Sequence, residues 1–204
     1  MVRLVALLLT VSVFGGCYLF TPRPDWSVET EFSPETYPDL AIMVKNSCPR
    51  KDPAIEKSVE KEFDIQLTNK GYGIVARGEK LRSLAEEQEQ QLSDLTKDRL
   101  IELGNVANAD ALVIVSLLEF DTTRVQRKEK NDQGREHSVQ YYLTTAKVAA
   151  ELLDLESGLT LWNAKFDDQT ESVDQRPDTA LLDDVARLVA ATCSPRPWYW
   201  YLYH

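Results

Sequence analysis

The chain is poor in the residues that most enzymes use for catalysis. Its 204 residues include only two histidines, His137 within a charged stretch and His204 at the end of the sequence. A serine or cysteine nucleophile needs a nearby base, which is usually histidine. The three cysteines have no neighbouring histidine or cysteine at the spacing of a structural zinc site, and the sequence contains no glycine-rich phosphate loop. We therefore expect a protein that is not an enzyme and that binds no metal or cofactor.

Basic residues are also scarce. The sequence has 23 lysines and arginines against 33 aspartates and glutamates, which gives a formal net charge of −10. Nucleic acids and anionic lipid surfaces attract basic patches, so this balance argues against either as the main partner. The hydrophobic fraction of 43% is ordinary for a globular protein. The length fits one domain.

No hydrophobic run is long enough to cross a membrane. The longest lies between Leu4 and Phe14, well below the roughly 20 residues of a transmembrane helix. It follows Arg3 and ends in two glycines before Cys17, which is the order of a secretory signal. The ending Phe14-Gly15-Gly16-Cys17 resembles a bacterial lipobox, which implies a signal peptide over residues 1–16 and a diacylated, palmitate-bearing Cys17 at the new N-terminus.

Two acyl chains are enough for stable anchoring, so the sequence predicts a lipoprotein tethered to a membrane. Tyr18 and Leu19 follow the cysteine, and neither is one of the acidic residues that hold lipoproteins at the inner membrane. We therefore expect the outer membrane, with the protein facing the periplasm. Prolines recur from Pro22 to Pro38 and exclude a helix there, so residues 17–39 are predicted to be the lipidated cysteine and an extended tether. Such a tether reaches at most about 65 Å.

Residues 40–194 show the periodicity of a single α/β domain. A strand is predicted at 40–45, a helix from Pro53 with an apolar stripe at Ile55, Val59, Phe63 and Leu67, a strand at 72–76 and two helices within 79–108. A core strand follows at 109–120, apolar throughout 111–115, then strands at 138–154 and 159–169, and a last helix from Pro177 to Cys193. Residues 121–136 are predicted to be a polar connection. The order β-α-β-α-β-β-β-α predicts a mixed sheet with long antiparallel C-terminal hairpin strands flanked by helices.

Three stretches resemble a superfamily of periplasmic lipoproteins. They are 84–95 with its Leu-Ser-Asp turn, 103–113 with its Ala-Asp-Ala entry to a strand, and 149–162 with a hairpin in which Gly158 precedes Trp162. The superfamily includes the curli secretion lipoprotein (CsgG-like), the penicillin-binding-protein activator lipoprotein (LpoB-like) and the N-terminal domain of the Tol-system propeller protein (TolB). The resemblance implies a non-catalytic protein-binding module in envelope assembly, transport or cell-wall synthase regulation.

Two other functions stay open from the sequence. One is a subunit of a curli-type outer-membrane secretion assembly, although the charged stretch 121–140 is unsuited to line lipid. The other is a periplasmic hydrolase built on a pair of the many carboxylates. The partner is expected to be an unidentified envelope protein or a second copy of the chain.

Two further features have alternative readings. Cys48 and Cys193 either form a disulfide, as an oxidising compartment allows, or remain two separate buried thiols. The tail at 195–204 is rich in aromatic residues. It either folds back on the domain as an edge strand or serves as a contact for a partner or a membrane surface. The candidate contact residues of this tail are Trp198, Tyr199, Trp200, Tyr201 and Tyr203.

Overall fold

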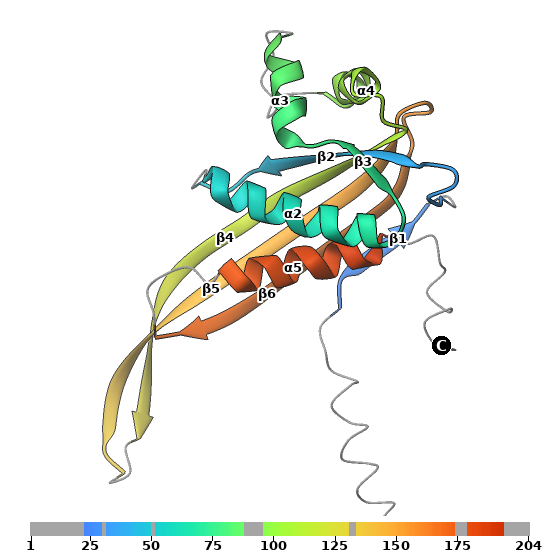
Figure 1. Ribbon diagram of the computed structural model, residues 1–204. Helices are drawn as coiled ribbons and strands as arrows, with labels where there is room; N and C mark the ends of the chain where they lie inside the picture. Colours follow the sequence, from blue (N-terminus) through green and yellow to red (C-terminus); the bar gives the residue numbers. More distant parts are fainter. Residues whose placement is uncertain are drawn as a thin grey trace, which may run out of the picture.

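The computed structural model describes residues 23–29, 32–49, 52–87, 96–130, 134–173 and 179–193. Its strands form one six-stranded sheet in the order β1-β6-β5-β4-β2-β3 (Figure 1), and helices pack on both of its faces. The parallel strands β2, β3 and β4 make one side of the sheet, and antiparallel pairing joins β4, β5, β6 and β1. The predicted mixed α/β class is therefore confirmed. The elements are β1 (Asp25–Val28), β2 (Asp39–Asn46), α2 (Pro53–Asn69), β3 (Gly73–Ala76), α3 (Gly78–Glu87), α4 (Lys97–Val106), β4 (Ala111–Lys130), β5 (Glu136–Asp154), β6 (Thr160–Ser172) and α5 (Thr179–Thr192).

Helix α2 begins and ends where its sequence directs. The carboxylate of Asp52 accepts a hydrogen bond from the backbone N–H of Ala54 at 2.9 Å, and Pro53 occupies the first turn. After Asn69 the chain leaves the helix through Gly71, whose φ of +96° is open to glycine without strain. The predicted stripe is buried at Val59, Phe63 and Leu67. It faces the sheet and α5.

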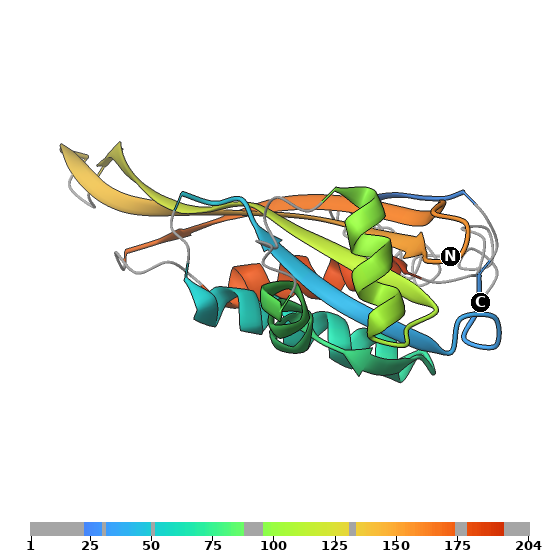
Figure 2. The same cartoon turned by 90° about the horizontal axis from the view of Figure 1, so that it is seen from above.

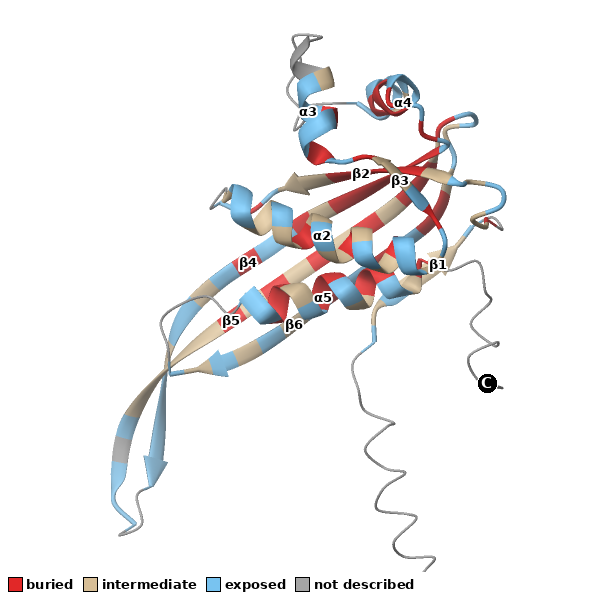
Figure 3. Cartoon of the chain, in the orientation of Figure 1, coloured by how far each residue is buried: buried red, intermediate tan, exposed pale blue. Residues whose placement is uncertain are grey.

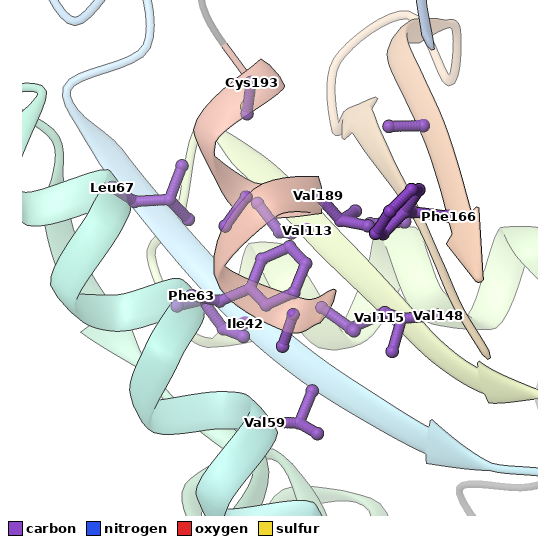
Figure 4. Close-up of a cluster of buried hydrophobic side chains, with 14 of the residues drawn as sticks. Ile42, Val59, Phe63, Leu67, Val113, Val115, Val148, Phe166, Val189 and Cys193 are labelled. Atoms are coloured by element: carbon purple, nitrogen blue, oxygen red, sulfur yellow. The ribbon is translucent and has the colours of Figure 1, made fainter. Parts of the chain in front are cut away.

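The main core lies between the sheet and the helices α2 and α5, which run side by side on one face (Figure 1). Alternate residues of the central strands point into it, because successive strand residues face opposite sides. Figure 4 shows Phe63 of α2 and Val189 of α5 among these strand side chains. The core also includes Trp162, which is fully buried. Gly158, with a φ of +69°, lies in the turn between β5 and β6, and β6 then places Trp162 opposite Leu152 in this core.

A second, smaller core lies on the opposite face of the sheet. Leu81 of α3 and Leu100 and Leu103 of α4 pack there on Met43 and Leu112. The two helices cover only the end of the sheet where β4 begins. The predicted division of this helical stretch near Ser93 lies outside the described residues.

The chain joins the fold earlier than the sequence predicts. Asp25–Val28 forms edge strand β1 on β6, with Trp26 opposite Ala164, and Phe32 is only 2% exposed in the main core. The prediction of an extended tether reaching residue 39 is therefore wrong. The prolines of this stretch prevent a helix but allow a short edge strand and turns, so composition alone did not distinguish a tether from an edge strand.

The predicted polar connection at 121–136 is also wrong over most of its length. Strand β4 continues to Lys130 and pairs residue by residue with β5 from Glu136 onward. In an antiparallel pair alternate residues exchange backbone hydrogen bonds with the partner strand whatever their side chains are, so this polar stretch forms a strand without being buried. The result is a hairpin that extends past the helices (Figure 2).

Candidate functional site

The outer half of the β4–β5 hairpin extends beyond the hydrophobic core. We call it the arm, and it comprises residues 121–130 of β4 and 136–145 of β5. Phe120 and Ala146, immediately below it, are the last residues of the two strands in the main core. At about 3.4 Å per residue, the ten residue pairs of the arm span roughly 34 Å. Figure 3 shows mostly exposed and half-buried residues along it.

Within the described chain, the arm has little support from neighbouring strands. Strand β2 ends at Asn46, opposite Leu117, so β4 has no further neighbour on that side within the described residues. Strand β6 ends at Ser172, opposite Tyr142. Beyond that point the arm is a two-stranded ribbon. Such ribbons are marginally stable in water on their own.

The strand register assigns every arm residue to one of two faces, because residues directly opposite each other in an antiparallel pair share a face. The helix-side face continues the core side of the sheet through Thr122 and Thr144, whose hydroxyls lie 3.1 Å apart. Three basic residues are exposed on it, and its one acidic residue in the arm is Glu136 near the tip. The basic residues of this face are Arg124, Lys128 and Lys130.

The other side of the arm, the open-side face, is apolar and acidic. Its half-buried apolar residues are Val125, Val139, Tyr141 and Leu143, and its exposed acids are Asp121, Glu129 and, from β6, Glu171. The guanidinium of Arg127 donates two hydrogen bonds to the carboxylate of Glu171. The hydroxyl of Tyr141 donates to Glu129, and this bond raises the pKa of Tyr141 above its usual value. Because Arg127 lies on β4 and Glu171 on β6, their ion pair crosses β5 on this face.

A groove of about 790 Å³ lies elsewhere, between α2, α3 and the ends of β2 and β3. Its main charges already have partners inside the protein. Arg82 pairs with Glu56 at 3.1 Å, and the Glu60 carboxylate accepts the backbone N–H of Gly78 at 2.8 Å. Burial raises the pKa of Glu60. This arrangement fastens α3 to α2, which is a structural role.

Cys48 and Cys193 are two separate buried thiols in the structure. Cys48 lies just before α2 begins, and its Sγ is 3.8 Å from the carbonyl oxygen of Leu117. The carbonyl of Cys193 accepts a hydrogen bond from the Nζ of Lys70, which follows the end of α2. The 17 residues of α2 separate these positions by about 25 Å. A disulfide needs Cα atoms within about 7 Å, so of the two alternatives left open by the sequence the structure has the separate buried thiols and not the disulfide. The reason is that α5 runs alongside α2 and ends beside the end of α2.

The remaining predicted site residues lie outside the described residues. These are the lipidation site Cys17 and the aromatic residues Trp198, Tyr199, Trp200, Tyr201 and Tyr203. Among the described residues, no helix is both long and apolar enough to cross a membrane, and no group of three His, Cys, Asp or Glu side chains is placed to hold a metal ion. Sequence reasoning missed the arm as a site. The alternation of Val139, Tyr141 and Leu143 was the available signal.

Comparison with known proteins gives fold likenesses at low identity. No family model matches the chain, and no curated protein matches it either. Among solved structures, the PelC dodecamer from Paraburkholderia phytofirmans is 15% identical, with a TM-score of 0.48 over 82% of this chain and 94% of that one. Lipoprotein GNA1162 from Neisseria meningitidis is 13% identical, with a TM-score of 0.47 over 68% and 86%. The LpoB C-terminal domain from Salmonella enterica is 12% identical, with a TM-score of 0.40 over 69% and 85%. One of these neighbours is described as a lipoprotein, but likenesses this distant carry no argument about what this chain binds.

Proposed function

We propose that the chain is a lipid-anchored envelope lipoprotein that acts without catalysis, by holding another envelope protein at the arm. Residues 1–16 are then a signal peptide, Cys17 carries the lipid, and the folded domain faces the periplasm from the outer membrane. The observation that carries the proposal is the arm itself. It places ten pairs of strand residues beyond the helix-covered core.

The physical cost of the arm supports a binding role. Exposed strand edges invite aggregation, and proteins usually shorten or cover them. Here the ribbon is long and is fixed by its own side-chain contacts, such as Arg127 with Glu171. Among the described residues the outer part of the ribbon, beyond Tyr142, has two unpaired edges and two different faces, and such a ribbon can bind a protein through backbone or side-chain contacts.

The charges of the arm favour a protein partner over lipid. Arg124 and Lys128 lie on one face, while Arg127 and Glu129 lie on the other. A basic residue that faces the bilayer midplane costs about 2–4 kcal/mol, so neither face suits a membrane-spanning strand. This argues against the curli-type pore.

The partner must lie near the membrane. Strand β1 starts at Asp25, so residues 18–24 are the only free link to the proposed anchor. Seven extended residues span about 25 Å at most. The domain therefore lies close to the bilayer, and the arm, at roughly 34 Å, is longer than this link of about 25 Å.

The anchor is tested by radiolabelled palmitate in cells that produce the full chain. The native protein is expected to take up label and to fractionate with the outer membrane, whereas Cys17→Ser is expected to take up none. Equal labelling of the two proteins would refute lipidation. Recovery of the labelled native protein in the inner membrane would refute the outer-membrane site alone.

The arm is tested by replacing residues 123–143 with Asn-Gly, a turn that joins the opposed residues Thr122 and Thr144. Crosslinking in intact cells and pull-down of the lipoprotein are then compared for the native and shortened chains. We expect the shortened chain to keep its lipid and its thermal unfolding but to lose the crosslinked proteins. The matched control reverses three exposed lysines away from the arm, Lys57, Lys61 and Lys97. Retention of every crosslinked protein by the shortened chain would exclude the arm as the binding element.

A further inference from the structure

The two faces of the arm carry complementary charge and complementary apolar character. On the helix-side face the basic residues Arg124, Lys128 and Lys130 outnumber its one acid, Glu136, whereas on the open-side face the acids Asp121, Glu129 and Glu171 outnumber Arg127, which pairs with Glu171. Both sets lie on the same short ribbon. Each face therefore provides what the other one would bind.

The open-side face also has apolar surface that the described residues leave partly uncovered. Val125, Val139, Tyr141 and Leu143 are all partly exposed, and α3 and α4 cover only the other end of this side of the sheet. The helix-side face presents the long side chains of Arg124 and Lys128 together with Tyr142. The aliphatic stems of arginine and lysine cover apolar surface well while their charged ends stay in water.

We infer that the arms of neighbouring copies of this chain stack on each other, with the helix-side face of one copy on the open-side face of the next. This inference rests on the proposed function and names one occupant of the arm. The guanidinium of Arg124 and the amines of Lys128 and Lys130 then approach the acids of the next copy. Their aliphatic stems and Tyr142 cover its apolar residues.

A second copy is the occupant that the charge distribution favours. The chain has a net charge of −10, so two copies repel each other over most of their surfaces. The basic helix-side face is a surface by which one acidic copy can approach another. Lipid anchors would hold the copies on the same membrane, which raises their effective concentration.

The contact joins two different faces, so it does not have two-fold symmetry. Such heterologous contacts build closed rings or open chains of copies. A ribbon face about 34 Å long and about 10 Å wide offers roughly 340 Å², less than the about 800 Å² per partner of a stable interface. We therefore expect a weak, salt-sensitive contact that forms at membrane density.

The test uses the full lipoprotein in neutral phosphatidylcholine vesicles and a short thiol-reactive crosslinker. Gln126→Cys places a thiol on the helix-side face, and Thr123→Cys places one on the open-side face; both positions are exposed. Cys48 and Cys193 are buried and stay unreactive in the folded protein. We expect no dimer from either variant alone, a dimer from their mixture, and a ladder from the double variant.

Charge reversal provides the second measurement. Changing Arg124, Lys128 and Lys130 to Glu is expected to lower the yield of the mixed dimer about tenfold, because three surface ion pairs become repulsive. Mixing this variant with a copy that carries Asp121→Lys and Glu129→Lys, which leaves the Arg127–Glu171 pair intact, is expected to restore the dimer. Reversal of Lys57, Lys61 and Lys97 is the control and should leave the yield unchanged.

Each other result overturns the inference. Dimers from Gln126→Cys alone would show a two-fold contact, and no dimer from the mixture would show that the arms do not meet. An unchanged yield after reversal of the basic face would show that another surface joins the copies. These outcomes leave the proposed function standing if the arm still captures a different envelope protein in cells.

Discussion

Replacing Phe32 with alanine tests whether the chain before β2 belongs to the folded domain. Phe32 is 2% exposed in the main core, so folding removes nearly all of its side chain from water. Burying a phenylalanine side chain is worth about 1.5–3 kcal/mol, and the cavity left by truncation adds to the loss. Phe→Ala changes in cores cost about 3–5 kcal/mol. We expect Phe32→Ala to lower the free energy of unfolding by about that amount.

The measurement is guanidinium unfolding of the full lipoprotein in detergent, followed by far-UV circular dichroism and by tryptophan fluorescence. A lower midpoint with an unchanged slope indicates lost stability without a change in the unfolded state. Val173→Ala is the matched control, since Val173 is 78% exposed and surface changes stay within about 0.5 kcal/mol. If Phe32→Ala were as stable as this control, residue 32 would lie outside the fold. The tether predicted from the prolines would then be correct.

Three further predictions concern the end of α5. In the unfolded, unreduced protein two thiols should react with a chromogenic reagent and in the folded protein none, because Cys48 and Cys193 are both buried and free; an absence of reactive thiols on unfolding would show a disulfide. Burial raises the pKa of Cys193 from 9.0 to about 12, so the stability that its neutral thiol provides is complete below pH 9 and is lost as pH rises from 9 to 12. The free energy of unfolding of the native protein should fall relative to that of Cys193→Ala by up to about 1.4 kcal/mol per pH unit in this range, and parallel profiles would contradict the burial of this thiol. Finally, the Nζ of Lys70 donates to three carbonyls at the end of α5 at 2.6–3.2 Å, so Lys70→Met should lower the free energy of unfolding by about 2 kcal/mol; a loss no larger than that of the exposed control Lys57→Met would show that these bonds contribute nothing.

The sequence alone predicted the elements whose signals are local. Asp52, Pro53 and Gly71 mark the two ends of α2, and the spacing of Val59, Phe63 and Leu67 identifies its buried side. Such caps and periodicities act within one or two turns of the same helix, so no distant contact is needed to recognise them. The Gly158 turn is local in the same way, and the fully apolar start of β4 shows that helices cover the sheet there on both faces.

Only the tertiary structure decided the features that depend on pairing between distant residues. Trp26 joins the sheet because it pairs with Ala164, more than a hundred residues later in the chain. The proline-rich composition around Trp26 does not indicate this pairing. The arm is a strand because β5 pairs with it along its whole length, opposite polar residues such as Arg124 and Lys128, whereas hydropathy assigns these residues to a loop. The distance between Cys48 and Cys193 depends on the direction in which α5 packs along α2. The sequence determines which segments can form helices and strands, whereas the pairing of whole elements determines which faces they present and therefore where the protein can bind.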